Sequence, residues 1–258
     1  MRRLALIAAI LSFTTVAVAA QGRIILGVFA HPDDENLVGP TLAKYARMGN
    51  KVYVIIATDG SNGTRVTKIP AGEELAKVRR LETICACEKL GINKPIYFSQ
   101  PRLDTLFGLR PYLNSHALTK TLLKAKIEEL KPDAIITFGP DGEYGHSEHI
   151  VIGSIVQELL LREGWVDKYP LYFPVFTKEQ LGDDESVGYI DPRYINLTVK
   201  FSDADSIRYM EAAKCYVSQF TEKEIAQLIT DAKNDKEKSA HFRRFVIDPK
   251  RGKGSLLK

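Results

Sequence analysis

The stretch Ala30–Glu35 reads Ala-His-Pro-Asp-Asp-Glu and places one imidazole and three carboxylates within five residues. It directly follows the apolar run 24–29, whose length and β-branched residues are typical of a buried strand. The polar group therefore lies where a strand ends and a loop begins, the edge at which α/β folds bind ligands. Burial of so many ionisable groups is costly without a compensating cation, so a divalent metal is the expected partner.

A second polar cluster follows the apolar run 134–138 and contains His146 and His149. These two histidines are three residues apart at the start of a predicted helix, so they share one face. His31 and Asp34 have the same spacing. Two imidazoles and one carboxylate are a typical catalytic zinc set, which leaves an open position for water. One His-x-x-His pair is a weak signal, but two clusters that each follow a strand predict a metal site.

The elements that must position these clusters alternate along the chain. Strands are predicted at 24–29, 52–57, 95–98, 134–138, 171–175 and 195–199, and helices at 36–48, 73–90, 116–130, 148–161, 203–216 and 222–229. This alternation implies right-handed crossovers and an α/β, Rossmann-like three-layer fold with a mainly parallel sheet. The glycine-rich fingerprint of dinucleotide binding is absent after the first strand, which disfavours such a cofactor.

The chain has 258 residues and no Pro/Gly/Ser-rich linker, so residues 21–258 are predicted to form a single domain. Residues 1–20 have a different composition. Met1–Arg3 is basic, residues 4–18 are almost entirely apolar or small, and Ala17–Ala20 offers small residues for cleavage. This is the pattern of a secretory signal peptide, and we expect a secreted or periplasmic protein. An uncleaved N-terminal membrane anchor is the alternative, although the apolar core is shorter than the roughly 20 residues of a spanning helix.

The charge of the chain excludes one class of partner. Without residues 1–20 it keeps 34 basic and 32 acidic residues, a net charge of +2, and nothing favours nucleic acid. One basic cluster, from about residue 241 onward, contains Arg243, Arg244, Lys250, Arg251, Lys253 and Lys258. Contact with an anionic surface is conceivable, but a solvated, frayed tail is the favoured interpretation. The sequence gives no indication of an oligomeric state.

The three cysteines are Cys85, Cys87 and Cys215. Cys85 and Cys87 are two residues apart in a helical pattern and face different sides. They lack the spacing of a zinc pair. In an oxidising compartment Cys215 could pair with one of them. The favoured interpretation is that all three are small buried apolar residues.

Ala30–Glu35 and Gly145–His149 resemble the two signature motifs of the PIG-L/LmbE-like zinc deacetylases. That family hydrolyses N-acetyl groups from glucosamine-containing sugars and conjugates. The resemblance extends from about Arg23 to about Gln219, and the first motif is highly specific. It implies an LmbE-like fold and a bound Zn²⁺.

The resemblance also implies a role for each motif residue. The zinc ligands would be His31, Asp34 and His149. Asp33 would be the general base, His146 would assist at the oxyanion or the leaving group, and Tyr144 would help to polarise the carbonyl. The general acid stays open between Asp33 and His146. Zinc would lower the pKa of a bound water and polarise the amide carbonyl.

Two further residues match positions that contact the sugar in the family. They are Arg79, for which Arg80 is a competitor, and Asp104. The chain also departs from the family pattern. Glu148 stands where an Asp usually precedes the last histidine, so the orientation of a ligand could change. Tyr216 stands where the family has a histidine.

The sequence thus predicts a zinc-dependent amidohydrolase that removes an N-acetyl group from an N-acetylglucosamine-containing sugar or conjugate. One alternative is a metal-dependent phosphoesterase with two metal ions, which needs more bridging carboxylates than the two motifs supply. The other alternative is a non-catalytic sugar-binding protein, which is disfavoured because each expected catalytic position is filled. The sequences of the loops do not indicate a particular substrate.

Overall fold

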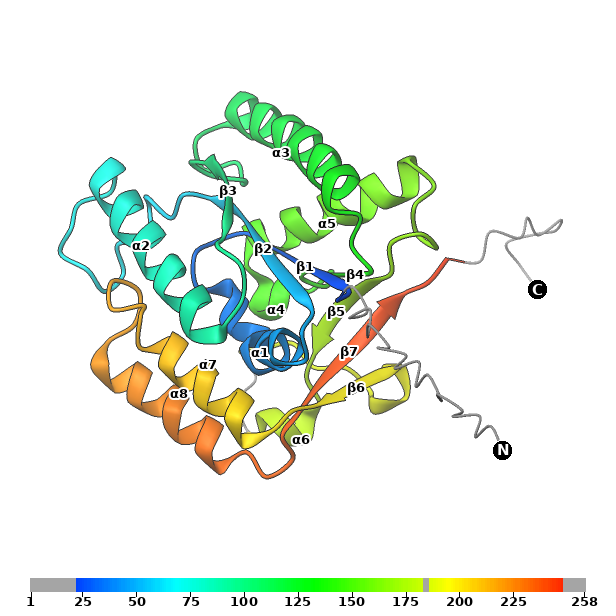
Figure 1. Ribbon diagram of the computed structural model, residues 1–258. Coiled ribbons are helices and arrows are strands. Elements are labelled where there is room, and N and C mark those ends of the chain that lie inside the picture. Colours follow the sequence, from blue (N-terminus) through cyan, green and yellow to red (C-terminus); the bar gives the residue numbers. More distant parts are fainter. Residues whose placement is uncertain (1–21, 183–185, 248–258) are drawn as a thin grey trace, which may run out of the picture.

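The computed structural model describes residues 22–182 and 186–247 (Figure 1). The strands are β1 Ile24–Phe29, β2 Lys51–Thr58, β3 Ile96–Gln100, β4 Ala134–Ile136, β5 Leu171–Val175, β6 Leu197–Lys200 and β7 Ser239–Phe245. The α-helices are α1 Gly39–Arg47, α2 Glu73–Leu90, α3 Leu109–Leu130, α4 Gly142–Gly145, α5 Ser147–Arg162, α6 Lys178–Leu181, α7 Asp203–Ala213 and α8 Glu222–Asn234. Short 3₁₀-helices are η1 Asp34–Val38 and η2 Pro192–Tyr194.

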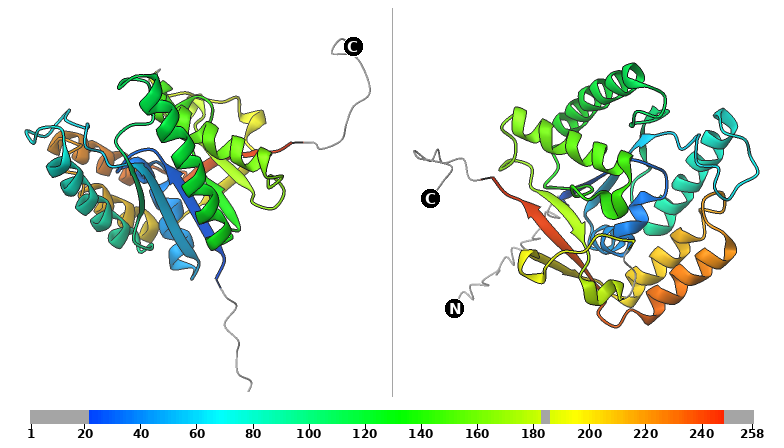
Figure 2. Two further views of the ribbon diagram at one scale, coloured as in Figure 1. Left: turned by 90° about the horizontal axis from the view of Figure 1, so that it is seen from above. Right: turned by 180° about the vertical axis from the view of Figure 1, so that it is seen from behind.

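The seven strands form one sheet in the order β3-β2-β1-β4-β5-β7-β6. The pairs among β3, β2, β1, β4 and β5 are parallel, and β7 pairs antiparallel with both β5 and β6. Helices α1, α2, α7 and α8 cover one face of the sheet, and α3 and α5 cover the other (Figure 2). The predicted three-layer α/β fold with a mainly parallel sheet is confirmed.

Strand β1 lies inside the sheet between β2 and β4, and it is buried from Ile25 to Phe29. Its neighbour β2 is also buried over its last five residues, so both strands are continuous apolar runs. Such runs are expected where helices cover both faces of a parallel sheet. The ends of β1, β3 and β4 lie at the same edge of the sheet, and the polar motifs follow β1 and β4 there.

The prediction of a frayed tail from about residue 241 is wrong as far as the structure describes it. β7 lies between β5 and β6, and Phe242 in its middle is buried. Arg243 and Arg244 are exposed and are registered opposite Phe173 and Tyr172. The charge of these arginines favoured a solvated tail, although they belong to a strand whose apolar residues contribute to the core. Residues 248–258, with the other basic residues of the predicted tail, lie outside the described residues.

The predicted signal peptide at residues 1–20 also lies outside the described residues. Among the helices that the structure describes, none has the length and apolar character to cross a membrane. Helix α3 begins at Leu109, earlier than the predicted start at 116. The added first turn contains Pro111, and a proline is tolerated there because the first N–H groups of a helix need no partner within the helix.

A disulfide joins Cys85 in α2 to Cys215 after α7, and Cys87 is free and buried. The favoured interpretation of three unpaired cysteines is therefore wrong, and the alternative that pairs Cys215 is confirmed. The bond forms because α2 and α7 lie side by side. A small apolar cluster fills this contact: Ala43, Ala86, Leu90, Ala212 and Tyr216.

Candidate active site

Three donor groups converge where β1 ends. His31 follows β1, Asp34 opens η1, and His149 lies in the first turn of α5. Nδ1 of His31 is 3.3 Å from Nε2 of His149 and 3.5 Å from Oδ2 of Asp34. Oδ1 of Asp34 is 3.2 Å from Nε2 of His149. Ligand atoms at about 2.0–2.2 Å from a tetrahedral zinc lie about 3.3–3.6 Å apart. The two imidazole nitrogens have this spacing, and each of them has one of the two Asp34 oxygens at a similar distance.

Each of these groups is oriented by a second contact. Nε2 of His31 lies 2.9 Å from Oε2 of Glu148, and Nδ1 of His149 lies 3.2 Å from the carbonyl oxygen of Gly142. Oδ2 of Asp34 accepts the backbone N–H groups of Ala30 and His31. These contacts place the ring protons on the outer nitrogens and leave the inner nitrogens free to bind a metal.

The charges around His31 favour a cation. Burial by itself would lower the pKa of His31, but Asp34 and Glu148 raise it to about 10. Burial would raise the pKa of Asp34, yet His149 and His31 hold it well below its usual range. Without a metal, the cluster therefore keeps a proton, and with it a positive charge, on His31. A divalent ion can take the place of that proton.

The backbone of Asp33 adopts the left-handed region, with φ of 98°. Its Oδ1 is 3.1 Å from Nη2 of Arg79, which also donates to the carbonyl oxygen of Pro32 at 2.6 Å. Burial raises the pKa of Asp33 to about 7, although Arg79 acts to lower it. This carboxylate lines the same cavity as His31 and does not share the convergent contacts of Asp34.

His146 immediately precedes α5, and its ring lies next to the rings of His31 and His149. Its ring centroid is 4.8 Å from that of His31 and 4.6 Å from that of His149. Burial and the two imidazoles lower the pKa of His146 to about 4, so its ring is neutral at neutral pH. Its Nδ1 accepts the N–H of Glu148 at 3.3 Å, which leaves the ring proton on Nε2.

The three histidines also form a group whose ligand atoms all lie within 4.8 Å of one another. This value is an outer limit for the group, and the Asp34 oxygens lie nearer, at 3.2 Å from Nε2 of His149 and 3.5 Å from Nδ1 of His31. The geometry therefore fits Asp34 better than His146 as the third donor around one small ion.

Tyr144 lies beside these rings and is half exposed. Its ring centroid is 5.4 Å from that of His149 and 5.7 Å from that of His146. Burial raises the pKa of Tyr144 to about 12, so its hydroxyl stays protonated and can donate a hydrogen bond.

The predicted sugar contacts have different surroundings. Arg79 is 2% exposed and lines the cavity, whereas Arg80 donates to Ser99 and stacks on Tyr97, away from it. The structure therefore places Arg79, and not its competitor, at the site. Asp104 is not among the lining residues; it accepts hydrogen bonds at 2.5 and 2.8 Å from Arg102, which does line the cavity.

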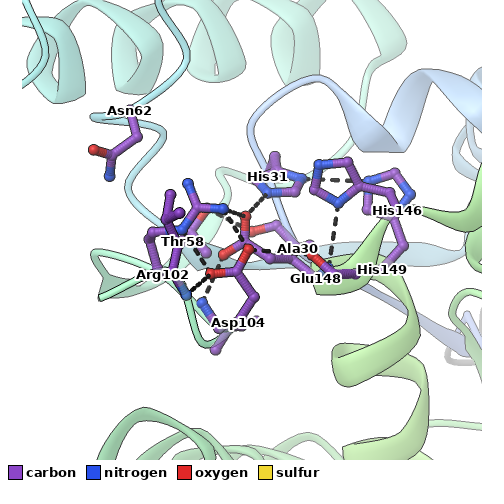
Figure 3. A network of polar contacts seen from close by, with 12 residues as sticks. Ala30, His31, Thr58, Asn62, Arg102, Asp104, His146, Glu148 and His149 are labelled. Atoms are coloured by element: carbon purple, nitrogen blue, oxygen red, sulfur yellow. Dashed lines mark hydrogen bonds and ion pairs between the residues drawn. The ribbon is translucent and has the colours of Figure 1, made fainter. Parts of the chain in front are cut away.

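Two residues of the site, Arg102 and Glu143, were not predicted from the sequence. Arg102 lines the cavity and lies 3.4 Å from Oε2 of Glu148 (Figure 3). It follows β3, a third strand that ends at the same edge, and that position was an available signal. Glu143 has φ of 70°, and its Oε2 is 3.7 Å from Nδ1 of His149. Burial raises the pKa of Glu143 to about 7.

The two departures from the family pattern have different consequences. The longer Glu148 side chain spans from His31 to the backbone N–H of Leu103, which its Oε1 accepts at 2.6 Å. Tyr216 is fully buried behind the site and donates its hydroxyl to Glu35. Neither residue removes a donor from the metal set.

A cavity of about 170 Å³ lies over these groups. It is lined by His31, Asp33, Asp34, Thr58, Gly60, Asn62, Gly63, Arg79, Pro101, Arg102, Tyr144, His146, Glu148 and Gln219. The segments at the ends of β1, β2, β3 and β4 and the segment after α7 thus contribute to one polar pocket. The pocket combines candidate metal ligands, a separate carboxylate that can act as a base, and groups that can donate hydrogen bonds. This is the arrangement of a metal-assisted hydrolase.

The comparison with family models agrees with this site. The model of the PIG-L family, described as GlcNAc-PI de-N-acetylase, matches residues 26–160, more than half of the chain. The chain therefore belongs to the PIG-L family, as the two motifs predict.

Curated relatives include the 1D-myo-inositol 2-acetamido-2-deoxy-alpha-D-glucopyranoside deacetylases of Mycobacterium sp. (strain JLS) and Rhodococcus jostii. The first is 30% identical over 176 residues, which cover 62% of this chain and 56% of the relative. The second is 32% identical over 151 residues, which cover 52% of this chain and 51% of the relative. The chain thus spans little more than half the length of these relatives.

Solved structures share the fold. The N,N'-diacetylchitobiose deacetylase of Pyrococcus horikoshii is 19% identical with a TM-score of 0.62, over 86% of this chain and 84% of that one. The 4-carboxy-2-hydroxymuconate hydratase of Pseudomonas putida is 14% identical with a TM-score of 0.61, over 90% of this chain and all of its own. Because a hydratase has the same fold, the site and not the fold must decide the reaction.

Proposed function

We propose that this protein is a zinc-dependent de-N-acetylase that hydrolyses the N-acetyl group of an N-acetylglucosamine-containing sugar or conjugate. One observation carries the proposal: Nδ1 of His31 and Nε2 of His149 lie 3.3 Å apart, each has an Asp34 oxygen at 3.2–3.5 Å, and the separate carboxylate of Asp33 lines the same cavity. Zinc held there would polarise the amide carbonyl and acidify water. The names of the curated relatives support the substrate class.

The residues of this chain then have distinct tasks. Asp33, held by Arg79, accepts a proton from the attacking water. His146, whose proton is on Nε2, and Tyr144 donate hydrogen bonds to the developing oxyanion. Asp33 returns the proton to the amine as the C–N bond breaks, and the products are acetate and an amino sugar.

Arg79 and Asp104 are proposed to contact the sugar. Arg79 is the buried cation of the cavity wall, and Asp104 is fixed by Arg102, which lines the cavity, and by Ser147. A carboxylate held in this way can accept hydrogen bonds from sugar hydroxyls.

We also propose that the protein is exported. The signal pattern of residues 1–20 supports this, and so does the Cys85–Cys215 disulfide, since disulfides persist mainly in oxidising compartments. An exported enzyme would act on envelope or extracellular glycans.

The test is acetate release from N-acetylglucosamine, its oligomers and its glycosides, with and without a chelator. Zinc-dependent release that the chelator abolishes and zinc restores is the expected result. Metal analysis separates the alternative: one zinc per chain supports the de-N-acetylase, whereas two ions with hydrolysis of a phosphate ester would support a phosphoesterase. Binding of the sugar without acetate release would support a sugar-binding protein.

A further inference from the structure

Four apolar side chains remain exposed beside the catalytic cavity. Leu106 and Phe107 precede α3, and Leu109 and Leu113 lie in its first two turns; their exposed fractions are 70, 51, 64 and 54%. We call these four residues the apolar lip. Leu109 and Leu113 are four residues apart on the helix, so they lie on one face. Single exposed apolar residues are ordinary, but four within eight residues are a feature of binding surfaces.

The apolar lip is joined to the cavity by Arg102 and Asp104. The Arg102 guanidinium, which lines the cavity, lies 5.8 Å from the centroid of the Phe107 ring. Asp104 accepts the N–H of Leu106 at 3.0 Å and the hydroxyl of Ser147 at 3.1 Å. These bonds fix the start of the apolar lip against the first turn of α5, which contains His149. The apolar lip is therefore continuous with the mouth of the site.

The size of the cavity determines what can reach the apolar lip. Its volume is about 170 Å³. Pockets that enclose a drug-sized ligand have volumes of about 300–1,000 Å³. This cavity is smaller than such a pocket, so part of a larger sugar conjugate must lie outside it, across the mouth.

The charge of the segment indicates the chemistry of that linked group. From Leu106 to Leu113 the chain contains one charged residue, Arg110, and no carboxylate. An apolar group that covers these side chains gains from the removal of apolar surface from water without desolvating an anion.

We propose that the apolar lip is a subsite for an apolar aglycone, so that the enzyme prefers N-acetylglucosaminides that carry an alkyl or aryl group. This rests on the proposed de-N-acetylase function and adds the class of the conjugate. The occupant is the substrate's own aglycone, not a membrane surface.

The test compares methyl and hexyl N-acetylglucosaminide below the concentration at which the hexyl glycoside forms micelles. Because the five extra methylenes would be partly covered, kcat/KM for the hexyl glycoside is expected to exceed that for the methyl glycoside by about tenfold. The double variant Leu109→Gln/Leu113→Gln is expected to lose this advantage and to keep the methyl rate. Leu118→Gln is the matched control, because Leu118 is exposed on the same helix but on another face.

Equal kcat/KM for both glycosides, or a hexyl advantage that survives the double variant, would overturn the proposal. So would loss of binding to phosphatidylcholine vesicles in the double variant with an unchanged hexyl advantage, which would assign the apolar lip to a membrane. If neither glycoside releases acetate, the proposed function fails, and calorimetry still tests the subsite. Tighter binding of the hexyl than the methyl glycoside, lost in the double variant, supports it, and equal binding overturns it.

Discussion

Carboxylates are buried both around His31 and in the contact between α2 and α7, but their partners differ. In the α2–α7 contact, Glu82 accepts the N–H and the hydroxyl of Ser218, both at 2.7 Å. Around His31, the carboxylate of Asp34 faces two imidazoles whose inner nitrogens have the spacing of metal ligands. Buried groups that satisfy one another stabilise the fold, whereas groups that converge on a common point are arranged for a ligand.

The two regions meet at Glu35. This residue directly follows Asp34 in the first motif, yet its side chain points to the α2–α7 side and accepts from Tyr216. Burial raises the pKa of Glu35 to about 8, so it is a neutral acid at neutral pH. The adjacent residues Asp34 and Glu35 thus belong to two regions. Asp34 is charged and belongs to the metal-binding set, whereas Glu35 is neutral and belongs to the α2–α7 contact.

The largest effect is expected from loss of a metal ligand. Asp34→Asn removes the anion between the two histidines, and loss of the ion's contribution of several kcal/mol would lower acetate release about a thousandfold. Zinc analysis after dialysis should find the variant empty. Asp191→Asn, at an exposed carboxylate paired with Arg193, is the control and should keep its zinc. Full zinc content in Asp34→Asn would contradict the ligand set.

The next effect separates the base from the ligands. Asp33→Asn should keep its zinc but lose about 10²–10⁴-fold in kcat, because only proton transfer is removed. Asparagine tolerates the left-handed backbone of residue 33, so the fold should persist. Zinc content and initial rates are measured on the same sample. An unchanged rate would show that another group accepts the proton.

A smaller effect is expected at Glu148, which orients the ligand His31 but does not itself bind the metal. Glu148→Gln removes the charge beside Nε2 of His31, and zinc affinity should fall about 10–100-fold, as for other residues that orient ligands. Competition with a chromophoric chelator measures that affinity. Glu148→Asp should weaken it too, because the shorter side chain cannot span both His31 and Leu103. Native affinity in both variants would rule out this orienting role.

The smallest effect on catalysis is expected in the α2–α7 contact. The double variant Cys85→Ser/Cys215→Ser should lower the free energy of unfolding by about 2–4 kcal/mol. Urea unfolding measures this loss, while zinc affinity and the rate of the folded protein should stay within about twofold of the native values. Release of zinc on loss of the disulfide would mean that the two regions are coupled.

The local signals in the sequence were sufficient for both motifs. His31 and Asp34 are close in the chain, and His146 and His149 share one helix start, so spacing alone places each pair. The strand patterns then place both pairs at one edge of a parallel sheet. The fold class followed from the same alternation, because parallel strands need helical crossovers.

What the sequence could not indicate depends on contacts between distant segments. The place of Arg102 in the site depends on its contact with Glu148 on α5, which the sequence alone does not indicate. The Cys85–Cys215 bond requires α2 and α7 to be neighbours. Strand β7 carries Arg243 and Arg244 on exposed positions, and only its pairing with β5 and β6 distinguishes it from a tail.

Anomalous diffraction at the zinc edge, from crystals of the zinc-loaded protein, identifies the atoms that hold the metal. We predict one zinc per chain, bound by Nδ1 of His31, a carboxylate oxygen of Asp34 and Nε2 of His149, with His146 unbound. Zinc on the three histidines with Asp34 free, or a second ion bridged by Asp33 or Glu143, would contradict this prediction.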